Sequence, residues 1–139
     1  MPPLKRWGKE ELERLTEMVE QDSLFYWNGP QTAAMLVEFR KHYPFEHCAP
    51  CSSGTAAIHM AVAALNLKPG DEIITTPITD MGTFIGALVE QCVPVFADLE
   101  PHTYNMDPAS IEACVTPKTK AIIAVHLAGN PANMDAIMA

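Results

Sequence analysis

The run Ser52-Ser53-Gly54-Thr55 is the part of this sequence best suited to bind a ligand, because it leads directly into an apolar stretch that is typical of a helix. Gly54 lets the chain turn without steric cost, and the first amides of a helix have no partner inside it. A phosphate held there gains the helix dipole and several N–H donors. The hydroxyls of Ser52, Ser53 and Thr55 can reach such an anion or simply cap the helix. Taken alone, the run is more typical of a capped helix, since no Walker lysine follows it.

The composition predicts one globular domain. The chain has 139 residues, of which 48% are hydrophobic, with seven glycines and twelve prolines. A net charge of −8 without any basic tract disfavours a surface for nucleic acid or for an anionic membrane. Residues 1–22 are charged and lack the apolar stretch of a signal peptide, and no run approaches about 18 apolar residues. We therefore expect a cytoplasmic protein with no nucleic-acid and no membrane partner.

Two of the four cysteines, Cys48 and Cys51, form a CAPC string that resembles half of a redox or zinc site. A thioredoxin-like pair opens a helix, whereas Cys51 leads into a separate turn. Zinc needs about two further ligands at matched spacing, and Cys92 and Cys114 are isolated. We therefore expect no metal, and a metal or redox domain built on His47, Cys48 and Cys51 is kept only as an alternative.

The first third of the sequence predicts two amphipathic helices, over residues 8–20 and 31–43, from apolar residues at helical spacing. Between them, residues 23–30 place three adjacent aromatic side chains before a Gly-Pro break, which predicts a loop with exposed aromatics. These aromatics either staple the first helix onto the body of the protein or contact a ligand.

After residue 46, expected strands and helices alternate. The strands are HCAPC (47–51), EIITT (72–76), PVFAD (94–98) and KAIIAVH (120–126), and the helices are 54–66, 82–91 and 108–115. Short apolar strands without strict alternation favour a parallel sheet covered by helices on both faces. Because ligands collect at the carboxyl ends of such strands, we expect four loops to share one rim: 52–55, 76–83, 98–107 and 126–131.

Several of these strings together resemble the DegT/DnrJ/EryC1/StrS family of pyridoxal-phosphate-dependent sugar aminotransferases. They are LFYWNG at 24–29, SGTAA and PGDE within 52–77, and TYNMDP, TPKTKAII and VHLAG within 94–137. The resemblance covers nearly the whole chain. It implies an α/β fold, namely a partial large domain of the aspartate-aminotransferase-like fold (PLP fold type I), with a mostly parallel sheet and flanking helices. Residues 1–45 would be amino-terminal helices and an aromatic loop, and residues 46–139 the first part of the PLP-binding large domain.

The resemblance also implies a reaction, in which pyridoxal 5'-phosphate (PLP) carries an amino group from glutamate or glutamine to a nucleotide-linked keto sugar. Gly54, Thr55 and Ala56 match the turn that holds the cofactor phosphate, Thr55 by hydroxyl and amide and Ala56 by amide. Gly29 and His126 match segments near the substrate pocket. For His126, a bond to neighbouring backbone is the alternative.

One position departs from the family pattern. Where the family usually has an aromatic residue that stacks on the cofactor ring, this sequence has Asp80. Either Met81 or Phe84 takes over the ring contact, or Asp80 turns toward the amino donor, the substrate or a main-chain amide. The plainer alternative is that Asp80, itself a candidate cofactor-binding residue, caps the helix that is expected to begin near residue 82.

The resemblance places the Schiff-base lysine beyond residue 139, so we expect no catalytic residue in this chain and no activity from it alone. Six lysines are present, and all match surface or loop positions of the family: Lys5, Lys9, Lys41, Lys68, Lys118 and Lys120. The alternative function is a non-catalytic module that binds a phosphate ligand or a partner. Because the family's cofactor lies at a dimer interface, and strand edges left bare recruit other chains, we expect a homodimer, a higher oligomer or a rearranged sheet.

Overall fold

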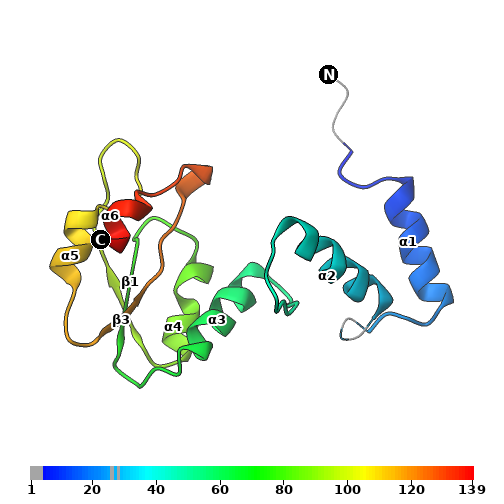
Figure 1. Cartoon of the computed structure of the whole chain (residues 1–139), viewed down its shortest axis with the longest axis horizontal. Coiled ribbons are helices and arrows are strands. Elements are labelled where there is room, and N and C mark those ends of the chain that lie inside the picture. Colours follow the sequence, from blue (N-terminus) through cyan, green and yellow to red (C-terminus); the bar gives the residue numbers. More distant parts are fainter. Residues whose placement is uncertain (1–4, 26, 28) are drawn as a thin grey trace. The chain divides into compact units, whose positions relative to one another are not determined.

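The computed structural model describes residues 5–25, 27 and 29–139, so Tyr26 and Asn28 of the expected aromatic loop lie outside the described residues. The chain divides into two compact units, Met1–Pro50 and Cys51–Ala139 (Figure 1).

The amino-terminal unit contains the two expected helices. Helix α1 spans Lys9–Glu20 and begins at Gly8, whose amide donates a hydrogen bond to the Glu11 carboxylate (2.6 Å). Helix α2 spans Pro30–His42, with proline in its first turn, where a missing N–H costs nothing. Among the described residues of this unit, none is buried. Phe25 and Trp27 are 70% and 51% exposed in an irregular segment, which confirms the loop with exposed aromatics.

The second unit is built on a three-stranded parallel sheet in the order β2-β1-β3. The strands are β1 (Glu72–Thr75), β2 (Val93–Phe96) and β3 (Thr119–Ile122), and they match three of the four expected strands. The helices are α3 (Gly54–Ala64), α4 (Ile85–Val89), α5 (Pro108–Cys114) and α6 (Met134–Met138), with 3-10 turns η1 (Met81–Thr83) and η2 (Leu127–Gly129). The parallel α/β architecture predicted from the sequence is therefore confirmed.

Apolar side chains pack on both faces of the sheet. Neighbouring residues of β1 point to opposite faces, so Ile73 and Ile74 enter different clusters. Ile73 packs in a buried cluster with Val62 of α3 and Ala87 of α4. Ile74 packs in a second cluster with Met106 and with Ile111 of α5. Two apolar cores therefore flank the central strand, and α3 and α4 lie side by side (Figure 1).

Helices α3 and α4 approach each other closely at a glycine. A Cβ atom on Gly86 would lie 2.8 Å from the Cα atom of His59, which is nearer than real Cβ contacts come. Beside this crossing, His59 Nε2 lies 2.7 Å from Glu90 Oε1, which links α3 to the end of α4. Any larger residue at position 86 would push the helices apart, so Gly86 fixes where α3 lies against the segment that follows β1.

Two predictions about secondary structure are wrong. Residues 47–51 form no strand, because none of their backbone groups pairs with another backbone group among the described residues and Pro50 has no N–H. The helix expected over 82–91 is split into η1 and α4 at Phe84, whose backbone is not helical (φ −120°, ψ −6°). No helix in the described part of the chain is both long and apolar enough to cross a membrane.

Asn105 ties together two of the loops at the carboxyl ends of the strands. Its side chain is buried, and its Nδ2 group donates to the carbonyls of Asn130 and Pro131, both at 3.1 Å. Its Oδ1 atom accepts from the amide of Leu127 at 3.1 Å. One side chain therefore satisfies three backbone groups of loop 126–131 and holds that loop against loop 98–107.

Replacing Asn105 with alanine should destabilise the fold, because the three backbone groups would lose their partners in a buried place. We expect the free energy of unfolding to fall by about 3 kcal/mol, measured by urea denaturation. The matched control is Asn133→Ala, which removes an exposed asparagine that caps α6, and should cost about 1 kcal/mol or less. Equal losses in the two variants would contradict the role given to Asn105.

Candidate anion-binding site

The start of α3 presents unpaired hydrogen-bond donors. Ser53 caps the helix, and its Oγ atom accepts from the Ala56 amide at 3.1 Å. The Ala57 amide donates to the Ser53 carbonyl at 3.0 Å. Within the described part of the chain, the amides of Gly54 and Thr55 have no acceptor. Two free N–H groups therefore lie at the positive end of an 11-residue helix, an arrangement that favours an anion.

The loop that follows β1 meets this helix start at Gly82. A Cβ atom on Gly82 would lie only 2.5 Å from Thr55 Oγ1, so the threonine hydroxyl rests directly against the glycine. The hydroxyl makes no hydrogen bond to any described residue. Loops 52–55 and 76–83 therefore come together as predicted, and a free hydroxyl joins the two free amides at one exposed place.

Asp80 lies beside the same glycine and caps η1. Its Oδ1 atom accepts from the Gly82 amide at 2.7 Å, so of the alternatives left open by the sequence the structure shows the bond to a main-chain amide. Phe84 is engaged elsewhere, because its ring packs edge to face on Phe96 with centroids 5.4 Å apart. Met81, in contrast, is 55% exposed.

His126 follows β3 on an exposed segment at the same edge of the sheet. Its Nδ1 atom accepts from the Ala132 amide at 3.0 Å, so the neutral ring carries its proton on Nε2. The structure thus shows the bond to neighbouring backbone. Gly29 belongs to the amino-terminal unit, where a Cβ atom would lie 2.4 Å from the Phe25 carbonyl oxygen. Substrate contact by either residue stays a prediction.

Two residues that organise the loops at the carboxyl ends of the strands had no part in the sequence-based prediction of the site. Gly82 is the first, and its signal was a glycine two places after Asp80, in the loop that was already expected to reach the ligand. Asn105 is the second, and its signal was an asparagine within the expected loop 98–107. It follows Tyr104, whose backbone lies in the left-handed region (φ 57°). Gly82 acts through packing and Asn105 through hydrogen bonds, in both cases between segments far apart in the sequence, which no local pattern reveals.

The metal and redox hypothesis gains no support. Among the described residues, no three His, Cys, Asp or Glu side chains lie close enough together to hold a metal ion. All four cysteines are free thiols. Burial raises the pKa of the Cys92 thiol, and the nearby carboxylates of Asp71 and Glu90 raise it further, so this thiol is poorly reactive.

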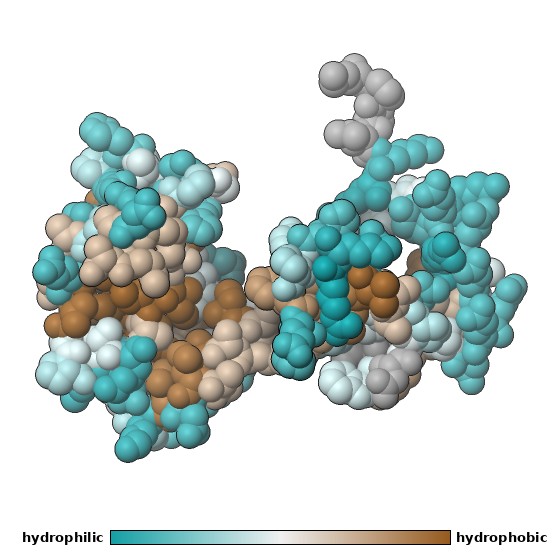
Figure 2. Space-filling view, in the orientation of Figure 1, coloured by the Kyte–Doolittle hydropathy of each residue, from teal (hydrophilic) through white to brown (hydrophobic). Residues whose placement is uncertain are grey.

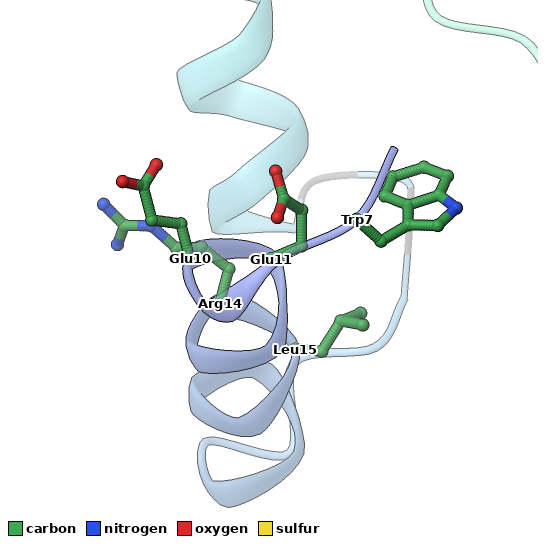
Figure 3. A pocket seen from close by; sticks show the side chains of 5 residues that line it. All are labelled: Trp7, Glu10, Glu11, Arg14 and Leu15. Carbon is green, nitrogen blue, oxygen red and sulfur yellow. The ribbon is translucent and has the colours of Figure 1, made fainter. Parts of the chain in front are cut away.

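A separate hollow lies on α1 and contains none of the expected site residues. It is lined by Trp7, Glu10, Glu11, Arg14 and Leu15. Figure 3 shows Glu10 and Arg14 to one side of the first turns of α1 and Trp7 and Leu15 to the other, with Glu11 between them. All five are exposed, and Arg14 is paired with Glu17 at 3.0 Å. We assign this hollow no ligand.

Comparisons with known proteins agree on one family. The model of the DegT/DnrJ/EryC1/StrS aminotransferase family matches residues 5–139. The spore coat polysaccharide biosynthesis protein SpsC of Bacillus subtilis is 40% identical over 132 residues, which are 95% of this chain and 33% of that protein. The UDP-2-acetamido-2-deoxy-3-oxo-D-glucuronate aminotransferase of Pseudomonas aeruginosa is 39% identical over 114 residues, which are 82% of this chain and 32% of that protein.

A solved structure extends this likeness to the fold. NtdA from Bacillus subtilis, determined with the bound cofactor PMP, superimposes with a TM-score of 0.84 at 33% identity, over 91% of this chain and 28% of NtdA. The predicted fold, part of an aspartate-aminotransferase-like large domain, is therefore confirmed. The chain spans about a third of the length of the relatives it matches. It belongs to the DegT/DnrJ/EryC1/StrS aminotransferase family, whose members depend on PLP.

Proposed function

We propose that the start of α3 holds the phosphate group of PLP. The observation that carries this proposal is the meeting of three unpaired donors, the amides of Gly54 and Thr55 and the hydroxyl of Thr55, at the positive end of one helix. A phosphate dianion needs several such donors, and α3 supplies them with a favourable dipole. Ala56 would add its amide by sharing it between Ser53 Oγ and the phosphate.

The residues of this chain would hold and aim the cofactor. When bound, PLP supplies an aldehyde that accepts an amine and a ring that stabilises the negative charge left when a proton leaves the donor carbon. Fixing the phosphate at Thr55 orients the rest of the molecule relative to the strand ends. We place the anchoring lysine outside residues 1–139, because the six lysines of this chain match surface or loop positions of the family and none matches the anchor.

For the whole protein, we propose transfer of an amino group from glutamate or glutamine to a nucleotide-linked keto sugar in the cytoplasm. Family membership and the name of the Pseudomonas relative, a UDP-sugar aminotransferase, support this proposal. In it, residues 46–139 are the first part of the PLP-binding domain, and Gly29 and His126 contribute to the substrate pocket. Nε2 of His126 would be free to donate to the substrate, because Nδ1 is already bonded.

Replacing Thr55 with valine should weaken phosphate binding without changing the shape of the side chain. Pyridoxamine 5'-phosphate is the suitable probe, because it lacks the aldehyde that would react with surface lysines. We expect its dissociation constant, measured by isothermal titration calorimetry, to rise about tenfold, since a hydrogen bond to a charged group is lost.

Two controls accompany this variant. Pyridoxamine, which lacks the phosphate, should bind the wild-type chain more weakly than pyridoxamine 5'-phosphate and should not distinguish wild type from Thr55→Val. Thr16→Val, on exposed α1, should bind as the wild type does. Equal affinity of the wild-type chain for the two probes would overturn the phosphate site.

Met81 is the exposed apolar side chain that we propose to cover the cofactor ring, because Phe84 is engaged with Phe96. A thioether gains from contact with an aromatic ring. Met81→Ala should therefore raise the dissociation constant of pyridoxamine 5'-phosphate about threefold, measured by the same titration. Met81→Phe should bind at least as tightly as the wild type. Unchanged binding in Met81→Ala would remove the residue from the site.

We also propose that the protein self-associates as a homodimer or a higher oligomer. Figure 2 shows apolar surface on the second unit, and a hollow beside the edge strand β3 is lined by Val115, Ile122 and Met138. Sedimentation velocity at micromolar concentration should show species larger than a monomer, and Ile122→Lys should shift them toward monomer. Val37→Lys, at a more exposed position on α2 (56% against 37% for Ile122), is the control. A monodisperse wild-type monomer with well-protected amides would contradict this proposal.

A further inference from the structure

Gly82 is crowded by two side-chain oxygens at once. A Cβ atom at this position would lie 2.5 Å from Thr55 Oγ1 and 3.0 Å from Asp80 Oδ1. Both oxygens therefore crowd the position that a Cβ atom of this residue would take. Gly82 does not have a positive φ, so it is required here for space and not for an unusual backbone conformation.

Asp80 determines where Gly82 lies. Its carboxylate accepts from the amide two residues later, which is the geometry that fixes a short polar turn. A second bond, between the hydroxyls of Thr79 and Thr83 at 2.7 Å, closes the same turn. The turn is thus held by two side-chain bonds, and of the two only the Asp80 bond reaches the residue that touches Thr55.

We propose that Asp80 is a positioning residue for the phosphate site, acting through Gly82 on the Thr55 hydroxyl. This inference rests on the proposed function of the α3 start. By holding the Gly82 amide, Asp80 keeps the Cα atom of Gly82 against Thr55, and the threonine side chain keeps the rotamer in which its hydroxyl lies at the helix start. In this chain Asp80 therefore shapes the site. The aromatic residue that the family usually has at this position would instead stack on the cofactor ring.

Electrostatics favour this role over direct contact with the ligand. A carboxylate close to Thr55 repels a phosphate dianion, and no described cationic side chain forms an ion pair with Asp80. Asparagine caps a turn as well as aspartate does and carries no charge. The cap, and not the charge, is the property that the site needs.

Three variants separate these roles. Asp80→Ala removes the cap, and Asp80→Asn keeps the cap without the charge. Asp107→Ala is the matched control, because Asp107 caps α5 by an equivalent bond to the Ala109 amide (3.0 Å) away from Thr55. Each variant is measured for its affinity for pyridoxamine 5'-phosphate and for the Thr55 rotamer, reported by three-bond NMR couplings to the Thr55 methyl group.

We expect Asp80→Ala to lose at least about fivefold in affinity for pyridoxamine 5'-phosphate and to show an averaged Thr55 rotamer. Asp80→Asn should keep the wild-type rotamer and bind as tightly as the wild type or more tightly. Asp107→Ala should melt at a lower temperature while keeping both site properties.

The proposal is overturned if Asp80→Ala keeps the wild-type Thr55 rotamer, or if Asp80→Asn loses as much affinity as Asp80→Ala. The second result would show that the charge itself contacts a ligand. Failure of the proposed function is a separate outcome, seen when the wild-type chain binds pyridoxamine and its phosphate equally. In that case the rotamer measurement alone decides whether Asp80 positions Thr55.

Discussion

The packing of two glycines against α3 is the constraint on which the site depends. Gly82 meets Thr55 and Gly86 meets His59. Thr55 and His59 lie one turn apart on α3, and the two glycines are likewise four residues apart in the segment after β1. The segment after β1 therefore lies along one side of α3, and at these two positions it presents no side chain of its own to the helix. Because β1 is the central strand of the sheet, this contact fixes the start of α3 relative to the carboxyl ends of the strands. A methyl group at either glycine would meet an atom nearer than 3 Å.

This arrangement explains why the site is made of small residues. Its donors are backbone amides and one hydroxyl, and its shape depends on the absence of a side chain at positions 82 and 86. The polar side chains nearby serve the backbone: Ser53 and Asp80 cap helical turns, and Asn105 binds three groups of the loop that follows β3. In the proposed function, the cofactor would supply the chemistry, and these loops and the start of α3 would bind and orient it.

Much of the fold could be predicted from the sequence, because apolar strands between turn residues and helices with clear spacing are local patterns. Three strands, their parallel direction and the helix that begins at Gly54 followed from such patterns. HCAPC did not become a strand, because a strand exists only when another strand pairs with it. The break at Phe84 and the contact of Gly82 with Thr55 depend on residues far apart in the sequence, and no periodicity announces them. The cap formed by Asp80 was foreseen as one alternative, yet only the structure shows what it holds in place.

The central claim is that a phosphate binds where α3 begins, against the glycine that Asp80 holds. The most direct measurement is a titration of the isotope-labelled chain with pyridoxamine 5'-phosphate, followed by amide chemical shifts. The account predicts the largest shifts at the amides of Gly54, Thr55 and Gly82, with the first turn of α5 unchanged. Shifts concentrated elsewhere, or equal shifts with pyridoxamine, would contradict it.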